Sequence, residues 1–491
     1  MTNLFEMHDH SFYAYMSCMP SWFSSNPPFA TIAHLNPEQT MNTLCKIALL
    51  AITFLHVAKL FMPVSLELLS FFTAVLFVCG LGMQKKGFLR ITVLFFVLGT
   101  TILLAYRLAF PVWMQSLTSM TNIIAIIVVM QLFSIPIEAG RYSDTVEYWL
   151  KKLFRKESSL YFFAMLVTNL FSSFLLFGTV PVMVALFNKA LKNSVLDYQR
   201  FFATAIMRGY ALVLFWAPGA VIILLVMQVT HVSWSELFVP GFLLSTIGLI
   251  TSYLLEHTLR FNRPVLSEPF EASANLARNA PRQTAHIVLV VVSLLLCIAL
   301  LESFSIGTAT GRILLAGFMI SVVWIVSFAK HPKLVTILKT YAQSGITQAT
   351  DFAVFFIAVG LFAGAIDHSG ILMHVQPLLQ ESINRMGIFS IVVIPLLFIV
   401  IAIFGIHPLV LAVMFGKILL SLSLPLSSVS VALLLILAAA ISFIVSPFAG
   451  MSLMTAKFLN VTPLDVSLRW NLLFCTLFLA EGILFAYAWS L

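Results

Sequence analysis

Long apolar stretches dominate this chain of 491 residues, and they are incompatible with a water-soluble globule. Hydrophobic residues make up 60% of the chain and charged residues 9%, whereas soluble domains average about 45–50% and about 25%. Because a helix needs roughly 20 apolar residues to cross a bilayer, the sequence predicts an all-α polytopic membrane protein. The eleven predicted crossings are 44–62, 64–83, 90–109, 119–137, 202–229, 237–255, 285–303, 311–328, 350–367, 430–457 and 471–490.

Two further apolar stretches, 159–187 and 387–419, are about 30 residues long and fit a different geometry. If each returns to the side from which it entered, 21 of the 27 Lys and Arg residues fall on one side of the membrane. Basic residues concentrate on the cytoplasmic side of membrane proteins. We therefore expect a re-entrant helical hairpin in each stretch. The amino terminus is then cytoplasmic and the carboxyl terminus outside, in the cell (inner) membrane.

An internal repeat relates the two halves of the chain. The segment FGTVPVMVA from Phe177 matches FGIHPLVLA from Phe404, and Ala217-Pro218 matches Ser446-Pro447. Downstream of these prolines, VSWSEL from Val232 aligns with VTPLDV, 229 residues later. Five predicted crossings separate equivalent points of the two copies, so the second copy is inverted. Inverted repeats with interrupted helices are typical of secondary transporters.

The repeat predicts the organisation of the chain. The predicted parts are a cytoplasmic amino-terminal segment (1–43), a first half (44–255) with an inward hairpin (159–187) and a broken helix (202–229), a cytoplasmic linker (256–284), and a second half (285–491) with an outward hairpin (387–419) and a broken helix (430–457). The hairpins, both broken helices and spans 119–137 and 350–367 would form a transport domain. Spans 44–109 and 237–328 would form a scaffold, with 471–490 at the periphery.

This architecture resembles the ion transporter superfamily, which includes divalent anion/sodium symporters and arsenite permeases. The positions that carry the resemblance are the hairpin tips and the helix breaks, although the Ser-Asn-Thr triplet of the symporter branch is absent from both tips. The resemblance implies that a solute binds between the tips and the breaks. The substrate-binding residues predicted on this basis are Gly178, Thr179, Pro181, Ala217, Pro218, Gly219, Gly405, His407, Pro408, Ser446, Pro447 and Gly450.

Ionisable residues at membrane depth are further candidates, because charge near the bilayer centre is costly. His407 would carry a coupling proton or bind a substrate oxygen, or would be satisfied by hairpin carbonyls. Arg208 would bind an anionic substrate, or would extend to the cytoplasmic surface. Lys417, on the returning arm of the outward hairpin, would bind the substrate or extend to the external surface. Glu138 and Asp367 occupy equivalent positions in the repeat, and they are candidates for proton transfer or for solvated helix ends.

Polar residues that enter the inner hairpin allow two interpretations. Asn169, Ser172 and Ser173 would contact the solute, or would serve as hydrogen-bond partners between helices.

These patterns predict a secondary-active transporter that moves a small anionic solute by an elevator-type mechanism coupled to protons or sodium. Two alternatives remain, the membrane subunit of a binding-protein-dependent transporter and a proton antiporter or cation exporter of the same fold. The five cysteines show no metal-ligand spacing and no catalytic motif is present, so we expect no enzyme activity, no metal site and no cofactor beyond a coupling ion. The expected partners are the lipid bilayer, the solute and a second copy in a homodimer, and not nucleic acid.

Overall fold

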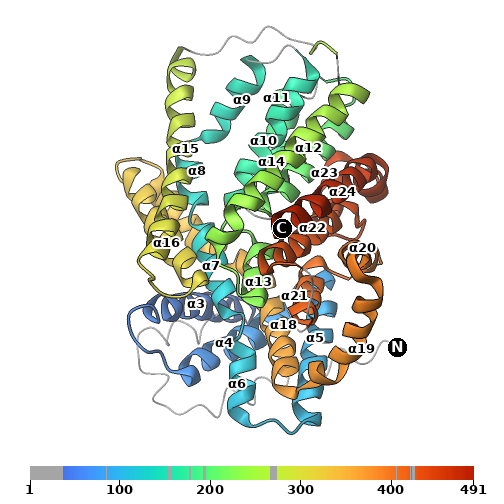
Figure 1. Cartoon of the computed structure of the whole chain (residues 1–491). Helices are drawn as coiled ribbons and strands as arrows, with labels where there is room; N and C mark the ends of the chain where they lie inside the picture. The colour runs from blue at the N-terminus through green and yellow to red at the C-terminus, as the bar shows by residue number, and fades with distance from the viewer. Residues whose placement is uncertain are drawn as a thin grey trace, which may run out of the picture.

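A computed structural model describes residues 37–84, 86–152, 156–175, 179–191, 195–261, 263–265, 274–404, 406–420, 422 and 426–491. These residues form helices and connecting turns, with an isolated bridge between Lys156 and Pro264 as the β pairing found among them (Figure 1). The helices of the first half are α3 (Pro37–Ala58), α4 (Leu66–Met83), α5 (Lys86–Ala105), α6 (Phe110–Thr118), α7 (Thr121–Gln131), α8 (Ser134–Ala139), α9 (Tyr142–Lys152), α10 (Glu157–Leu175), α11 (Thr179–Leu191), α12 (Tyr198–Val213), α13 (Val221–Thr230) and α14 (Trp234–Leu259).

The second half continues with helices of similar length. They are α15 (Ala274–Ser303), α16 (Ala309–Ser327), α17 (Leu334–Thr340), η3 (Tyr341–Gly345), η4 (Ile346–Ala349), α18 (Thr350–Ser369), α19 (Ile371–Met386), η5 (Gly387–Phe389), α20 (Ser390–Ile403), α21 (Pro408–Leu420), α22 (Ser428–Val445), α23 (Gly450–Leu459), η6 (Asp465–Arg469) and α24 (Trp470–Ser490).

Within the described ranges, ten helical segments are long and apolar enough to cross a membrane. Nine of them overlap predicted crossings, and the tenth, Gln380–Ile403, contains the first arm of the predicted outward hairpin. Predicted span 90–109 becomes a shorter apolar helix, Leu89–Ala105, and span 202–229 divides into α12 and α13. The chain is an all-α polytopic membrane protein, as the composition predicts.

Helix bounds and caps reproduce the repeat. The second half of each broken helix, Val221–Thr230 in α13 and Gly450–Leu459 in α23, has the same length at an offset of 229 residues. Both end on a left-handed residue that is not glycine, with φ of 56° at His231 and 60° at Asn460. Such backbone is uncommon outside glycine, so its recurrence at equivalent positions shows that the two copies share a local fold.

The hydrogen bonds after these left-handed residues repeat as well. Ser233 and Glu236 form a reciprocal capping box at the start of α14. At the equivalent positions, the Thr462 hydroxyl accepts from the Asp465 N–H (3.2 Å) and donates to the Asp465 carboxylate (2.7 Å). The sequence pairing of these four residues therefore corresponds to the same turn in both halves.

Helix packing has a two-fold character. The helices of the first pair, α10 and α11, contact each other, α12 and the distant α23. The helices of the second pair, α20 and α21, contact each other, α22 and the distant α13. Each pair thus packs against the first half of its own broken helix and the second half of the other. Figure 1 shows α11 in the upper part of the molecule and α21 in the lower part.

The remaining helices group differently from the sequence expectation. Helices α7 and α18 pack mainly against α3, α4, α5, α6 and α16, whereas the sequence placed their spans with the hairpins. Conversely, α14 and α24 pack against each other and against α12 and α22, where the sequence placed 237–255 in the scaffold and 471–490 at the periphery.

Close packing of α6 on α18 depends on two glycines. A Cβ on Gly364 would lie 2.6 Å from the Ser116 hydroxyl, and one on Gly360 would lie 2.8 Å from the Ser119 hydroxyl. The Ser119 hydroxyl instead donates to the Gly360 carbonyl at 3.0 Å. Small residues four apart let membrane helices approach closely, which explains why α18 is held within the α3–α7 group.

Candidate functional site

The first helix break separates α12 from α13 at Ala217, Pro218 and Gly219, all of which are buried. Proline lacks an N–H and disfavours helical backbone in the residue before it, so the sequence itself interrupts the helix here. Gly219 packs against α7, since a Cβ at this position would lie 2.9 Å from Met130 Cγ. The chain resumes at Ala220, whose extended backbone starts α13 without a side-chain cap.

The second break separates α22 from α23 at Ser446 and Pro447. The buried Ser446 hydroxyl donates to the Ala402 carbonyl on α20 at 2.9 Å, which ties the break to its own hairpin. The first break has an equivalent tie, because Trp216 Nε1 donates to Asn169 Oδ1 on α10 at 3.2 Å. Gly450 begins α23 and is exposed, with no side-chain cap at the preceding alanine.

The two hairpin tips differ in exposure. Thr179, at the start of α11, is fully buried, whereas Ile406 before α21 is 45% exposed. Gly178 and Gly405 lie outside the described residues, and Pro181 falls in the first turn of α11. At the two tips, the structure therefore describes the neighbours of Gly178 and Gly405, namely Thr179 and Ile406.

His407 caps the amino terminus of α21. Its Nδ1 accepts from the Leu409 N–H at 3.3 Å, and Pro408 occupies the first helical position, which requires no N–H donor. An accepting Nδ1 is unprotonated, so the neutral ring carries its proton on Nε2. The half-buried ring also packs against Phe355 of α18 and Phe443 of α22, at centroid distances of 5.9 and 5.7 Å.

A pocket lies where the first break, α10 and the start of α21 converge, with about 290 Å³ of empty space including its opening to solvent. Ser172 of α10 and Leu409 of α21 reach it from the two hairpins, and Ala220 from the first break. The other lining residues, from α12, α13 and α22, are Tyr210, Val213, Leu214, Val221, Ile222 and Phe443. None of the predicted substrate-binding residues lines the pocket, which lies beside the first break and between one helix of each hairpin.

Tyr210 and Phe443 are functional candidates that the sequence reasoning missed. The centroids of their rings are 6.2 Å apart, and the ring of Phe443 also packs against the ring of His407. The chain has 45 phenylalanines, so aromatic residues on apolar helices gave no distinguishing signal. Their proximity to the two breaks, within eight residues of Pro218 and four of Pro447, is the signal that would have indicated them.

Helix ends provide the electrostatics of the cavity, because none of its lining residues carries a formal charge. Val221 and Ile222 belong to the first turn of α13, and Leu409 to the first turn of α21. The positive end of a helix dipole favours an anionic group. At α21 the N–H groups of Leu409, Val410 and Leu411 already donate to His407, so this helix contributes its dipole alone. Polar side-chain groups come from Ser172 and Tyr210, and the rest of the lining is apolar.

Arg208 does not face this cavity in the structure. Its fully buried guanidinium donates to Asn471 Oδ1 (2.7 Å), Ser252 Oγ (3.1 Å), Glu256 Oε1 (2.9 Å) and the Trp470 carbonyl (3.0 Å). These acceptors come from α14 and α24, so the guanidinium neither reaches the surface nor presents itself to a solute. The geometry corrects both sequence interpretations and makes Arg208 a link between α12, α14 and α24.

The two acids paired by the repeat also lie away from the cavity. Glu138 is exposed at the end of α8. Asp367, at the end of α18, forms an ion pair with Lys417 of α21. The structure thus joins two residues that the sequence singled out separately, and the pair connects the outward hairpin to α18.

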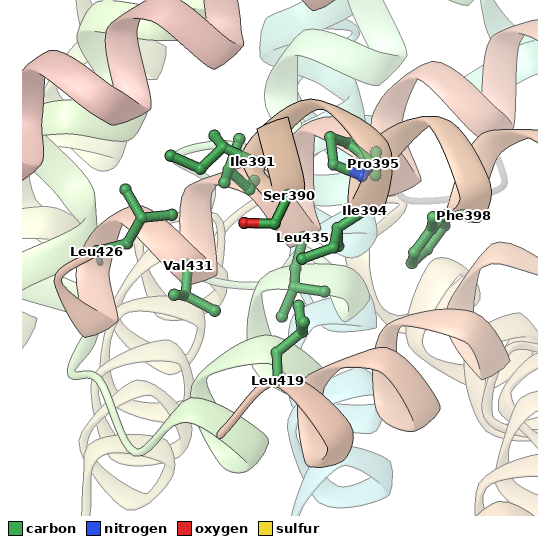
Figure 2. Close-up of a pocket in the computed structure, with 11 residues that line it drawn as sticks. Ser390, Ile391, Ile394, Pro395, Phe398, Leu419, Leu426, Val431 and Leu435 are labelled. Carbon is green, nitrogen blue, oxygen red and sulfur yellow. The ribbon is translucent and has the colours of Figure 1, made fainter. Parts of the chain in front are cut away.

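A second pocket lies between α20, α22 and the end of α21, with about 340 Å³ of empty space including its opening to solvent (Figure 2). Its lining is aliphatic and aromatic apart from Ser390, whose hydroxyl donates to the Gly387 carbonyl at 2.7 Å. None of the predicted site residues lines it. It offers no polar group to orient a charged solute, and the first cavity is therefore the better candidate.

No protein-family model matches the chain, and no curated protein matches it in sequence. Among solved structures, the chain is similar to the YdaH transporter of Alcanivorax borkumensis, whose topology is described as unusual. The TM-score is 0.59 at 12% identity, over 82% of this chain and 99% of that chain. At this identity the likeness shows the fold alone, and the chain has the fold of a membrane transporter.

Proposed function

We propose that this protein is a secondary-active transporter that moves a small anionic solute by an elevator-type alternating-access mechanism. The observation that carries the proposal is the pocket between the two helices of the first broken helix, α22 and one helix from each hairpin. The first turn of α13 would receive the anionic group of the solute, and the dipole of α21 would add positive potential. The lining of Tyr210, Phe443 and aliphatic side chains suits a solute with an apolar body.

Coupling of each hairpin to its break supports movement as one unit. The Trp216–Asn169 and Ser446–Ala402 hydrogen bonds join each break to the first arm of its own hairpin. The α3–α7 group with α16 and α18 would then be the static part. We further propose protons or sodium as the coupling ion, a homodimer as the assembly, and the cell membrane with a cytoplasmic amino terminus as the location.

Ligand-dependent thermal stabilisation of the purified protein tests the proposal. Dicarboxylates, sulfate, other oxyanions and amino acids would each be added with and without sodium and at two pH values. A ligand that binds only the folded state raises the unfolding temperature. We expect Ser172→Ala and Tyr210→Phe to reduce the shift, and Ile394→Val in the second pocket to leave it unchanged.

Failure to find any stabilising solute would favour the membrane subunit of a binding-protein-dependent transporter. A shift by metal cations alone would favour a cation exporter.

Side-specific labelling tests the inverted hairpins. Cysteines replacing Thr179 and Ile406 should react with an impermeant maleimide from opposite sides of a sealed vesicle. Reaction from the same side would contradict the inverted repeat and, with it, alternating access between these two hairpins.

A further inference from the structure

Glu481 is a carboxyl group at mid-depth in the membrane that no part of the proposed site uses. It lies eleven residues into α24, a helix of 21 residues, or roughly 16 Å along the axis. The hydrocarbon core is about 30 Å thick, so Glu481 lies near the bilayer centre. An acidic residue at that depth is costly unless it is protonated, paired or functional.

The only hydrogen-bond partner of Glu481 in the described chain is a neutral hydroxyl. Thr251 Oγ1 of α14 lies 2.8 Å from one carboxyl oxygen and 2.9 Å from the other. A hydroxyl donates to an ionised carboxylate and accepts from a protonated one. Thr251 therefore satisfies Glu481 in both protonation states, whereas a lysine or arginine would hold it ionised.

Helix packing places Glu481 beside the lipid-facing side of α24. Leu477 and Leu484, one turn before and after it, are 41% and 68% exposed, and Glu481 itself is half-buried. The neighbouring Gly482 faces the protein, since a Cβ there would lie 2.5 Å from Leu437 of α22. Glu481 thus lies at the edge of the seam between α14 and α24.

The same seam contains a second glutamate whose environment is the opposite. Glu256 of α14 is 1% exposed and lies 2.9 Å from Arg208 and 3.5 Å from Arg200. Glu256 is thus held between two guanidinium groups, whereas Glu481 has no ion pair among the described residues.

Other charged groups on the elements packed against α24 are engaged elsewhere. Arg208 and Arg200 of α12 face Glu256, and Asp465 of η6 pairs with Arg469. On α14, Glu236 is held in the capping box with Ser233, and His257 stacks on Tyr253. The helices α20 and α22 carry no ionisable side chain.

We propose that Glu481 is a proton-binding site, at which protonation in the α14–α24 seam couples proton movement to the transport cycle. The proposal rests on the proposed transport function and names its coupling ion as the proton. Protonation removes a charge beside lipid, so the protonated seam would slide past lipid more readily than the ionised seam.

A hydrophobic carbodiimide tests the site without a known solute, because this reagent reacts with protonated carboxyl groups within membranes. The full chain in liposomes would be treated with dicyclohexylcarbodiimide from pH 5 to pH 9, and the adduct located by mass spectrometry. We expect an adduct on Glu481 that falls at least tenfold across this range. It should be absent in Glu481→Gln, and Glu256 should remain unmodified as the internal control.

Thr251→Val sharpens the test. Loss of the hydroxyl should change the pH dependence of labelling without abolishing the adduct. Labelling of Glu481 that is equal at every pH, or absent at every pH, would overturn the proposal.

Coupling requires a second readout. Maleimide labelling of an Ile406→Cys variant should change with pH over the same range, and this dependence should disappear when Glu481→Gln is added. An unchanged pH dependence in the double variant overturns coupling through Glu481. Solute-induced thermal shifts test transport separately, so failure of the coupling site is distinguishable from failure of the transport proposal.

Discussion

The two broken helices share a backbone and differ in the side chains that hold them. The first, α12–α13, contains Arg208 with its four acceptors and Trp216 with its bond to Asn169. The second, α22–α23, has Leu437 and Val445 at the positions 229 residues later, and Ser446 supplies its tie to the hairpin. The repeat thus preserves caps and turns, while polar anchoring is concentrated in the first copy.

This difference suggests that the copies have different tasks. The first break is buried, whereas Phe448 in the second break is 64% exposed and Phe404 at the second hairpin tip is 82% exposed. A polar network has specific geometry and resists sliding, while apolar packing tolerates it. We therefore expect the interactions within the first copy to contribute more to the free energy of unfolding than those within the second.

The largest expected effect comes from removing the buried guanidinium. Arg208→Met should lower the free energy of unfolding by about 3–5 kcal/mol, because Glu256 loses its closest cation. The matched change Leu437→Met, at the equivalent position of the second copy, should cost less than about 1.5 kcal/mol. Denaturant unfolding in detergent measures both, and equal losses would show that the network contributes nothing special.

The next largest effects on stability should come from the two hydrogen bonds that join each break to its hairpin, and they should differ between the copies. Asn169→Leu leaves the buried Trp216 N–H without its acceptor, and we expect a loss of about 1–3 kcal/mol. Ser446→Ala removes one donor from the Ala402 carbonyl, which still accepts the Phe404 N–H, so about 0.5–1.5 kcal/mol is expected. A larger loss for Ser446→Ala would reverse the ranking of the two copies.

The helix cap at the outward tip gives a smaller effect. His407→Val, which copies the residue Val180 of the inward tip, should cost about 1 kcal/mol through loss of the acceptor for the Leu409 N–H. His407→Asn retains a capping oxygen and should restore most of this stability. If both variants are equally stable, His407 contributes to stability through its ring contacts and not as a helix cap.

The smallest effects should be equal in the two copies. Ser233→Ala and Thr462→Ala each remove the side-chain cap of an equivalent turn, at about 0.5–1 kcal/mol apiece. Thermal unfolding of the two single variants compares them directly. Unequal losses would indicate that the two turns, although they share a backbone conformation, contribute differently to the free energy of unfolding.

The sequence predicted the interruptions at Pro218 and Pro447, the apolar spans and the repeat, because these are local or periodic signals. It did not predict that Tyr210 and Phe443 line one cavity, since their proximity depends on how two copies fold against each other. It assigned Arg208 to a solute because its acceptor Asn471 lies 263 residues away in the chain. It passed over Glu481, which belongs to no motif and has no acid at the equivalent position of the repeat.

The bonds of Arg208 also bear on the biogenesis of the protein. Two of its acceptors, Asn471 and the Trp470 carbonyl, belong to α24, and Asn471 follows Arg208 by 263 residues in the chain. A guanidinium inserted with α12 therefore lacks two of its acceptors until α24 has been synthesised. Nascent chains that stop before α24 would retain an incompletely paired cation within the membrane, a feature by which membrane quality control would recognise them as unfinished.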